Sequence, residues 1–455
     1  MRRVGPSLVP FVRRRVLACA LMGLLWPHPM LGNESEAAAA SDPALMAEEP
    51  RGELRLADAL AAALLRNPEL AAFSGEIRVR EARALQAGLL PNPELLVEVE
   101  NVAGTGDFSG SEQAETTLLL GQPIELGGKR AKRRRLAERD TALAGWDYRL
   151  ARAEVLAEVA RAFAELLVAQ EQRELARELR GLAEQSLAAV APGSSGPGPA
   201  VESARAEVTL VSREIESQRA EAALATARLR LAALWGSREA RFESAHGDLR
   251  DVRPPPALPE LLARLDEGPE LARWADEIER HEAAVALEDS QRIPDVTAAA
   301  GFRRLEESED SVLLFGLAVP FPVFDRNQGE RLAARSELSS ARHRREAARV
   351  RVETELRVSL SELASSHAEI EALRGRALPR LEQAQRVVRD GHARGLFEPA
   401  ELWDAQGTLV ELRMRELDAL LRYHAAAAQI ERLTGQPVWE RPGPSGPVEG
   451  GRRAP

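Results

Sequence analysis

The chain has 455 residues, of which 44% are hydrophobic, 29% are charged and only 4% are aromatic. Alanine, leucine, arginine and glutamate dominate, which is typical of long helices. The formal net charge of -10 argues against nucleic-acid binding, so we expect no nucleic-acid partner.

The N-terminus combines a basic cluster with a short apolar run. Three arginines at 13–15 precede eleven mostly apolar residues at 16–26, which Pro27 ends. Eleven residues are too few to span a bilayer, so residues 1–32 are predicted to be a secretory signal peptide, followed by a linker over 33–53. Cleavage near Gly32 and cleavage within 37–40 both remain open.

The single cysteine, Cys19, lies in a sequence loosely similar to a lipoprotein box, so lipid attachment is a second possibility there. No other stretch of the sequence is apolar enough for a membrane helix. An exported chain of this kind can be periplasmic, secreted or an outer-membrane barrel.

The sequence repeats itself about 200 residues apart. Residues 67–70 (Asn-Pro-Glu-Leu) return as residues 268–271 (Gly-Pro-Glu-Leu), and residues 234–236 (Leu-Trp-Gly) align with 433–435 (Leu-Thr-Gly). A repeat of this length is too long for a solenoid module and predicts one pseudo-symmetric molecule with two similar halves. We place these halves at 54–250 and 251–436.

Each half is predicted to run helix, strand, strand, long helix, turn, helix. In the first half, residues 54–88 have a helical pattern that breaks at Asn67, because Pro68 disfavours the helical conformation in the residue before it. The pattern then changes to period two, with Leu95, Val97 and Val99 on one face. Leu96, Glu98 and Glu100 alternate with them, so this strand has an apolar outer face and a more polar inner face.

Strands are expected at about 94–103, 113–122, 294–303 and 311–320. About nine or ten residues are enough to cross a membrane when a strand is tilted. Prolines and glycines mark the bend from each strand pair into the helix that follows, and the candidates are Pro123, Gly127, Gly128, Pro320 and Pro322.

Uninterrupted helices are expected at about 130–190 and 328–390. Leu136, Leu143 and Leu150 recur every seven residues, as in a coiled-coil seam. The shorter helices before the strands and after the turn could stack end to end beside each long helix. The basic cluster at 129–135 is interpreted as a helix start beside a membrane or an acidic partner, or alternatively as a solvated face.

Four strands with one apolar face cannot lie in a bilayer alone, because the two sheet edges would leave backbone groups unpaired in hydrocarbon. Eight strands make a barrel filled by its own side chains, whereas twelve leave room for a channel. The sequence therefore favours a homotrimer over a dimer.

Four stretches resemble the outer membrane efflux protein family, the outer-membrane factors of tripartite export systems, and the first two are similar to its heavy-metal resistance branch. They are 121–130 (Gly-Gln-Pro-Ile-Glu-Leu-Gly-Gly-Lys-Arg), 319–329 (Val-Pro-Phe-Pro-Val-Phe-Asp-Arg-Asn-Gln-Gly), 402–406 (Leu-Trp-Asp-Ala-Gln) and 431–435 (Glu-Arg-Leu-Thr-Gly). The resemblance covers about 54–436.

The resemblance implies a mainly α fold with a membrane β-barrel portion, in which three chains form a twelve-stranded barrel and a long periplasmic helical barrel. It implies a passive duct in a Gram-negative outer membrane, fed by a periplasmic adaptor and an inner-membrane pump, which we expect to be proton-driven. Metal cations or small toxic compounds are the expected substrates, and neither catalysis nor a cofactor is expected.

The resemblance also implies a closing ring at the periplasmic tip. Glu401 and Asp404 fall on the two acidic positions of the family motif, three residues apart and so on one helical face. Where the motif can carry a basic residue that ties the closed tip together, this chain has Phe397. The two tip turns are the expected docking sites for the adaptor, and their residues are Gly193, Gly196, Gly391, Gly395 and Phe397.

Two other functions remain open. A periplasmic coiled-coil scaffold would explain the helices but not the alternating strand pairs, and an outer-membrane duct for polypeptide secretion would share the same fold. No nucleophile, acid pair or cofactor loop stands in a suitable context for an enzyme, and the seven histidines show no pair at metal-ligand spacing. The tail at 437–455 is rich in proline and glycine and is expected to be disordered.

Overall fold

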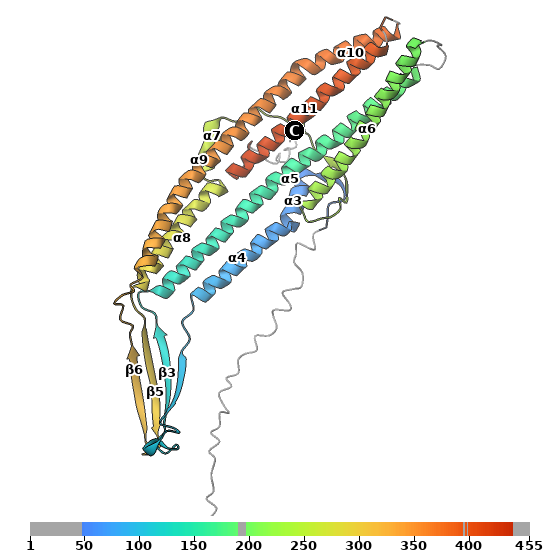
Figure 1. The fold of residues 1–455 in the computed structure, drawn as a ribbon. Helices are drawn as coiled ribbons and strands as arrows, with labels where there is room; N and C mark the ends of the chain where they lie inside the picture. The colour runs from blue at the N-terminus through green and yellow to red at the C-terminus, as the bar shows by residue number, and fades with distance from the viewer. Residues whose placement is uncertain (1–47, 190–196, 395, 398, 440–455) are drawn as a thin grey trace, which may run out of the picture. The chain divides into compact units, whose positions relative to one another are not determined.

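The computed structural model describes residues 48–189, 197–394, 396–397 and 399–439. Within these residues the chain is mainly helical and carries a two-stranded and a four-stranded sheet (Figure 1). The predicted signal peptide at 1–32 lies outside the described residues. Among the described helices, none is both long enough and apolar enough to pass through a membrane.

Helices account for most of each half of the chain. In the first half they are α3 (Leu56–Arg66), α4 (Pro68–Ala87), α5 (Lys129–Ala189) and α6 (Pro197–Ala233). In the second half they are α7 (Leu258–Leu265), α8 (Pro269–Gln291), α9 (Gln328–Ala372), α10 (Leu378–Ala393) and α11 (Pro399–Thr434). The 61 residues of α5 span about 90 Å at 1.5 Å per residue.

The second long helix is not uninterrupted as expected, because a π-helical turn at Leu373–Ala377 separates α9 from α10. Arg374 in this turn donates from Nε to Glu416 of α11 at 2.6 Å and from Nη1 to the carbonyl oxygen of Arg250 at 3.1 Å. A π turn adds one residue to the helical repeat and redirects the side chains around it. The π turn therefore coincides with the contacts that Arg374 makes with α11 and with the segment after β4.

Long helices and short helices pack side by side. Both α4 and α6 pack along α5, while α8 and α11 lie between α5 and α9. Figure 1 shows the same arrangement, with α4 and α6 one after the other beside α5. The expectation that two shorter helices stack end to end beside each long one is therefore confirmed.

The joints between the stacked helices show the duplication in atomic detail. In the first half Asn67 caps α4 by accepting bonds from the backbone of Glu69 and Leu70, and its amide donates to the carbonyl oxygen of Leu234 at 2.8 Å. In the second half Gly268 holds the same place, and a Cβ there would collide with the carbonyl oxygen of Leu433. The two halves therefore make the same joint with different chemistry.

A glycine in the left-handed region follows each of these joints. Gly236 has φ +74° and lies against Pro68, while Gly435 has φ +69° and lies against Pro269. Only glycine adopts this backbone conformation without steric cost, so both halves end their last helix in the same way.

The four-stranded sheet has the order β2-β3-β5-β6, and every neighbouring pair is antiparallel. The strands are β2 (Glu94–Glu100), β3 (Glu115–Ile124), β5 (Val296–Leu305) and β6 (Ser311–Ala318). β3 runs two residues beyond the expected 122 and β6 ends two residues before the expected 320. The sheet joins the strand pair of one half to the strand pair of the other.

A second sheet was not expected from the sequence. β1 (Gly52–Arg55) pairs in parallel with β4 (Phe242–His246). Residues 52–55 therefore form a strand, where the sequence predicted a linker up to residue 53 and a helix from residue 54. Leu54 and Phe242 are fully buried, and Gln170 of α5 extends the pairing by bonding to both backbone groups of Ala245. Burial against partners distant in sequence decides the conformation of this short segment.

The C-terminal segment is ordered further than expected. Val438 is buried, and Trp439 stacks on Tyr423 with ring centroids 5.7 Å apart. The Trp439 indole also donates to the carbonyl oxygen of Pro254 at 3.0 Å. The expected disordered tail therefore begins too early at 437, and residues 440–455 lie outside the described part of the chain.

Candidate functional site

The four-stranded sheet has one largely apolar face. Strand pairing places alternate residues of all four strands on this side. Phe315 is 83% exposed and Leu313 is 76% exposed. The face consists of Leu95, Val97, Val99, Leu118, Leu120, Ile124, Val296, Ala298, Ala300, Phe302, Leu313, Phe315 and Leu317, with Thr116, Gln122, Arg304 and Ser311 toward its ends.

The opposite face, which we call the polar face, carries most of the sheet's charge. Glu94, Glu98, Glu100 and Glu115 lie on it together with a single cation, Arg303. Arg303 contacts Glu115 at 2.7 Å and Glu100 at 3.2 Å. Its Nε also donates to the hydroxyl of Thr117 at 2.9 Å. Apolar residues such as Leu96 share this face, so it is acid-rich but not wholly polar.

Both outer strands of this sheet have an unpaired edge among the described residues. β2 pairs only with β3, and β6 pairs only with β5. Each outer strand therefore presents a row of backbone N–H and C=O groups that another strand can bind.

The predicted bend residues lie where strands pass into helices, with one correction. Pro123 is inside β3 and pairs with Thr297 of β5, so it does not end the strand. The pairing of β3 with β2 ends at Gly121, so the missing N–H of Pro123 costs no bond on that side. Gly127 and Gly128 both have positive φ, +70° and +71°, and form the bend into α5.

The bend after the second strand pair uses other residues. Pro320 and Pro322 follow the end of β6 at Ala318. Asn327 then adopts a left-handed conformation, and its amide donates to the carbonyl oxygen of Glu288 at 3.0 Å. This bond ties the start of α9 to the end of α8.

Ion pairs hold the strand-to-helix junctions of the two halves together. Asp295, just before β5, accepts from Lys129 at 2.8 Å and from the backbone N–H of Leu126 at 3.0 Å. Arg133 binds Glu125 through both guanidinium nitrogens, at 2.6 and 3.1 Å, and the Glu125 carboxylate raises the pKa of Arg133 above its ordinary value. The sheet is therefore anchored to α5 by charged contacts.

At the far end of the helices, the structure places Glu401 and Asp404 in the first turns of α11, and both side chains are exposed. Phe397 packs on Gly391, where a Cβ would collide with the aromatic ring. Gly193, Gly196 and Gly395 lie outside the described residues. A single chain does not bring Glu401 and Asp404 into a ring, so that prediction depends on assembly.

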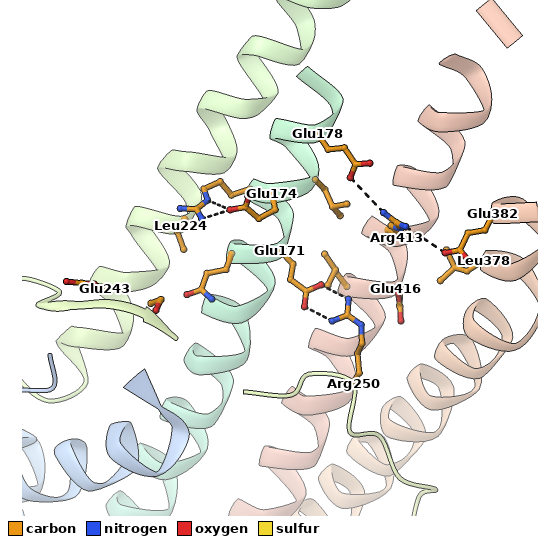
Figure 2. A pocket seen from close by; sticks show the side chains of 15 residues that line it. Glu171, Glu174, Glu178, Leu224, Glu243, Arg250, Leu378, Glu382, Arg413 and Glu416 are labelled. Atoms are coloured by element: carbon orange, nitrogen blue, oxygen red, sulfur yellow. Dashed lines mark hydrogen bonds and ion pairs between the residues drawn. The ribbon is translucent and has the colours of Figure 1, made fainter. Parts of the chain in front are cut away.

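A cavity of about 660 Å³ lies among α5, α6, α10, α11 and the segment after β4 (Figure 2). Arg250 binds Glu171 of α5 through two bonds of 2.7 and 2.5 Å, which raise the pKa of Arg250. Arg413 of α11 lies between Glu178 and Glu382, at 3.8 and 3.7 Å. The pair between Arg413 and Glu178 connects a helix of one half to a helix of the other.

Sequence reasoning missed this ion-pair network because its members are far apart in the chain. Arg250 and Glu171 are separated by 79 residues, and neither lies in a recognisable motif. Within the described residues, no group of three or more His, Cys, Asp or Glu side chains is arranged to hold a metal ion.

Long packed helices joined at both strand pairs to a sheet with one apolar and one acid-rich face are the features of a membrane channel protein. The family profile described as outer membrane efflux protein matches residues 59–237 and 263–436, one stretch in each half. The chain belongs to the outer membrane efflux protein family, which places it in the outer membrane. Efflux moves a substrate without converting it, so the family is not one of enzymes.

Two curated relatives carry metal-resistance names. The cobalt-zinc-cadmium resistance protein CzcC of Cupriavidus metallidurans is 34% identical over 326 residues, covering 70% of this chain and 77% of that protein. The nickel-cobalt-cadmium resistance protein NccC of Alcaligenes xylosoxydans xylosoxydans is 28% identical over 264 residues, covering 58% of this chain and 60% of that protein. The predicted similarity to the heavy-metal branch is therefore confirmed.

A solved structure shows the same fold at low sequence identity. The open state of the Neisseria gonorrhoeae MtrE outer membrane channel matches with a TM-score of 0.70 and 19% identity, covering 84% of this chain and 89% of that one. The predicted fold class is confirmed as far as a mainly helical outer-membrane channel chain with a strand portion.

Proposed function

We propose that the protein is the outer-membrane duct of a metal-cation efflux system and works as a homotrimer whose three sheets close into one twelve-stranded barrel. The observation that carries this proposal is the sheet itself, with an apolar face, an acid-rich face and two unpaired edges. In this assembly the apolar face meets lipid and the polar face lines the pore.

Strand direction supports closure by identical copies. The strands alternate in direction along the order β2-β3-β5-β6, so β6 of one chain next to β2 of another continues the antiparallel pattern. Closure also pairs the backbone groups that hydrocarbon cannot solvate. Three copies leave an open lumen, whereas two copies would make a barrel filled by side chains.

Two helices at the edges of the helical layer support the same assembly. α6 packs on α5 through one face, and its opposite face carries an exposed stripe without charge at heptad spacing. The α6 stripe consists of Val201, Ala204, Val208, Val211, Ile215, Gln218, Ala222, Ala225 and Leu229.

α9 carries a second exposed stripe, which contains no Asp, Glu, Lys or Arg although charged residues flank it. The α9 stripe consists of Leu332, Ser336, Ser339, His343, Ala347, Val350, Thr354, Val358, Ser361, Ser365 and Ala368. Solvated helix faces in this chain are densely charged, so exposed stripes of small and apolar residues favour contact with neighbouring copies.

Introducing charge into the α6 stripe tests the assembly. The trimer is measured by gel electrophoresis, as a band that dissociates when the sample is heated. Val208→Glu combined with Val211→Glu should abolish this band, because the double change would bury two carboxylates without partners at each interface. Thr209→Glu serves as the matched control, since Thr209 is exposed on the same helix but about 100° away from Val208. Trimers that survive the double change, or that are lost equally in the control, contradict the proposed interface.

Metal cations are the proposed substrates, on two grounds. The relatives CzcC and NccC are named for resistance to cobalt and cadmium, together with zinc or nickel. Acid exceeds base on the polar face of the sheet, which favours cations in a pore. Deleting the gene in its own host should lower the tolerated concentration of Co²⁺, Zn²⁺ and Cd²⁺. Unchanged metal tolerance with loss of a secreted polypeptide would instead support the secretion alternative.

The partners and the gate are part of the same proposal. A periplasmic adaptor docks at the tip turns near Gly391 and Phe397, and a proton-driven inner-membrane pump supplies the substrate. Glu401 and Asp404 from three chains form the acidic ring at the periplasmic mouth. Their exposure in the single chain supports this, because a ring must be built from side chains that are not already buried within one chain.

A further inference from the structure

A dense patch of positive charge begins α5, and the channel function does not account for it. Residues 129–135 contain six Lys or Arg among seven residues, in a chain whose net charge is -10. Lys129 pairs with Asp295 and Arg133 pairs with Glu125, so these two cations serve the junction. Arg134 pairs only with the exposed Glu138, four residues along the same helix.

Three cations remain for another partner. Among the described residues, Arg130, Lys132 and Arg135 have no acidic side chain within ion-pair distance, whereas many other arginines of the long helices do. Arg130 and Arg135 are exposed, and Lys132 is partly so. We call Arg130, Lys132, Arg134 and Arg135 the cationic patch.

Helix physics disfavours this placement. The N-terminus of a helix carries a partial positive charge, so cations in the first turns are destabilising and acids are preferred there. The first turn of α5 contains no acid, whereas the equivalent turn of α9 in the second half contains Glu330. The second half also passes from a strand into a long helix but does so without such a patch. An unfavourable local choice of this kind points to function.

The surroundings of the patch are apolar and exposed. The junctions between helices and strands at this end of the long helices present Leu90 at 64%, Ile124 at 45%, Phe321 at 89% and Phe324 at 91% exposure (Figure 1). Aromatic and aliphatic side chains of this kind lie at the boundary between hydrocarbon and headgroups. The apolar face of the sheet ends at Ile124 in β3, and the cationic patch begins six residues later at Arg130.

A hollow lies next to the start of α5, and Arg133 lines it, although the four residues of the cationic patch do not. It has a volume of about 500 Å³ and lies between the end of α4 and the start of α5. Arg83 lines it and has no ion pair among the described residues, while the Glu125 carboxylate that also lines it is already bound to Arg133. Leu89 and Leu90 form its apolar side.

We propose that the cationic patch binds the anionic headgroups of phospholipids in the membrane leaflet nearest the long helices. An anionic lipid satisfies both parts of this surface, because its phosphate meets the cations while its acyl chains continue along the apolar face of the sheet. The inference rests on the proposed insertion of the sheet in the membrane. Clusters of Lys and Arg next to a membrane segment are attracted to anionic lipid at a gain of roughly fivefold in affinity per residue.

The test compares lipids on the full-length protein purified in a neutral detergent. Binding of phosphatidylglycerol and of zwitterionic phosphatidylcholine is titrated in mixed micelles and followed by native mass spectrometry of bound lipids. The variant Arg130→Gln, Lys132→Gln and Arg135→Gln should lose on the order of 100-fold in affinity for phosphatidylglycerol. Its weaker binding of phosphatidylcholine should not change.

A matched variant controls for net charge. Arg152, Arg344 and Arg345 are exposed and have no ion pair among the described residues, and all three are at least four helical turns from the start of their helices. Changing all three to glutamine should leave the preference for phosphatidylglycerol intact. Equal binding of both lipids by the unaltered protein, or an unaltered preference in the patch variant, would overturn the proposal and leave an acidic protein as the partner of the patch.

Channel conductance in planar bilayers separates this outcome from failure of the proposed function. If the proposed function is wrong, the unaltered protein forms no channel in any lipid. If only the lipid proposal is wrong, the unaltered protein and the patch variant both conduct, and the two proteins show the same preference, or the same lack of preference, between the two lipids.

Discussion

Arg303 is the residue whose removal tests the polar face most directly. Glu100 and Glu115 lie opposite each other across β2 and β3, and Arg303 of β5 contacts both carboxylates. Like charges directly opposite in a sheet repel each other. The positive charge of the Arg303 guanidinium group offsets the repulsion between the carboxylates of Glu100 and Glu115. Arg303→Gln keeps a polar side chain of similar reach but removes the charge.

The expected cost in stability is moderate because the ion pairs are partly exposed. The side chains of Glu115 and Glu100 are 25% and 45% exposed, so each pair contributes about 0.5–1 kcal/mol. The hydrogen bond from Arg303 to Thr117 adds about 1 kcal/mol. Arg303→Gln should therefore destabilise each chain by about 2 kcal/mol and leave a folded channel.

The same change should also alter the ion selectivity of the channel. A unit charge about 10 Å from an ion in water interacts at about 0.4 kcal/mol, and 0.1 M salt reduces this to about 0.15 kcal/mol. Three added negative charges in a trimer then stabilise a cation by about 0.5 kcal/mol and destabilise an anion equally. The cation-to-anion permeability ratio should rise about fivefold.

Reversal potentials in planar bilayers under a KCl gradient measure this ratio. Arg304→Gln is the matched control, because Arg304 is the next residue, lies on the opposite face and contacts the loop at Glu306 and Glu309. Combining Arg303→Gln with Glu115→Gln should restore the original ratio. A ratio that does not change in Arg303→Gln, or that changes equally in Arg304→Gln, refutes the assignment of the polar face to the pore.

Three further predictions concern the helices. Replacing both Glu401 and Asp404 by alanine should reduce cation selectivity at the tip and increase antibiotic leak, and unchanged selectivity in bilayer recordings contradicts the acidic ring. Gly268→Ala should destabilise the second half by about 2 kcal/mol, because the new methyl group would collide with a backbone carbonyl of α11; an unchanged midpoint of thermal unfolding contradicts this. Burial lowers the pKa of His424, although its bond to the Leu249 carbonyl opposes the shift. The unfolded chain therefore binds a proton more readily than the folded one, so stability should fall as pH drops below about 6.5, and His424→Gln should remove that part of the pH dependence of unfolding.

Periodicity was sufficient to predict the strands and the main helices. The alternation from Leu95 to Val99 has no competing helical interpretation, and the seven-residue recurrence of Leu136 and Leu143 is sustained over many turns. Strand ends were less predictable. Pro123 suggested a strand end, but a proline can remain in a strand where the neighbouring strand has already stopped.

Features that depend on distant partners could not be predicted from local pattern. The segment Gly52–Arg55 is too short to show a period, and its strand conformation comes from pairing with Phe242–His246. The π turn at Leu373–Ala377 does have a local mark, since Gly375 lies within it and Pro379, which lacks a backbone N–H, follows it. Its contacts with distant segments have none. Its Arg374 binds Glu416, which is 42 residues further along the chain.

Comparison of the two halves distinguishes features that the fold requires from features that serve the function. The helix joints keep their geometry in both halves, although Asn67 in one is replaced by Gly268 in the other. The strand-to-helix junctions differ in length and backbone conformation, and one carries the cationic patch while the other carries exposed Phe321 and Phe324. Both kinds of side chain suit a membrane boundary, so the proposed lipid contact would give each half its own kind of membrane anchor. A barrel of three chains would then alternate cationic and aromatic contacts around its circumference, which anchors it to headgroups and hydrocarbon at the same depth.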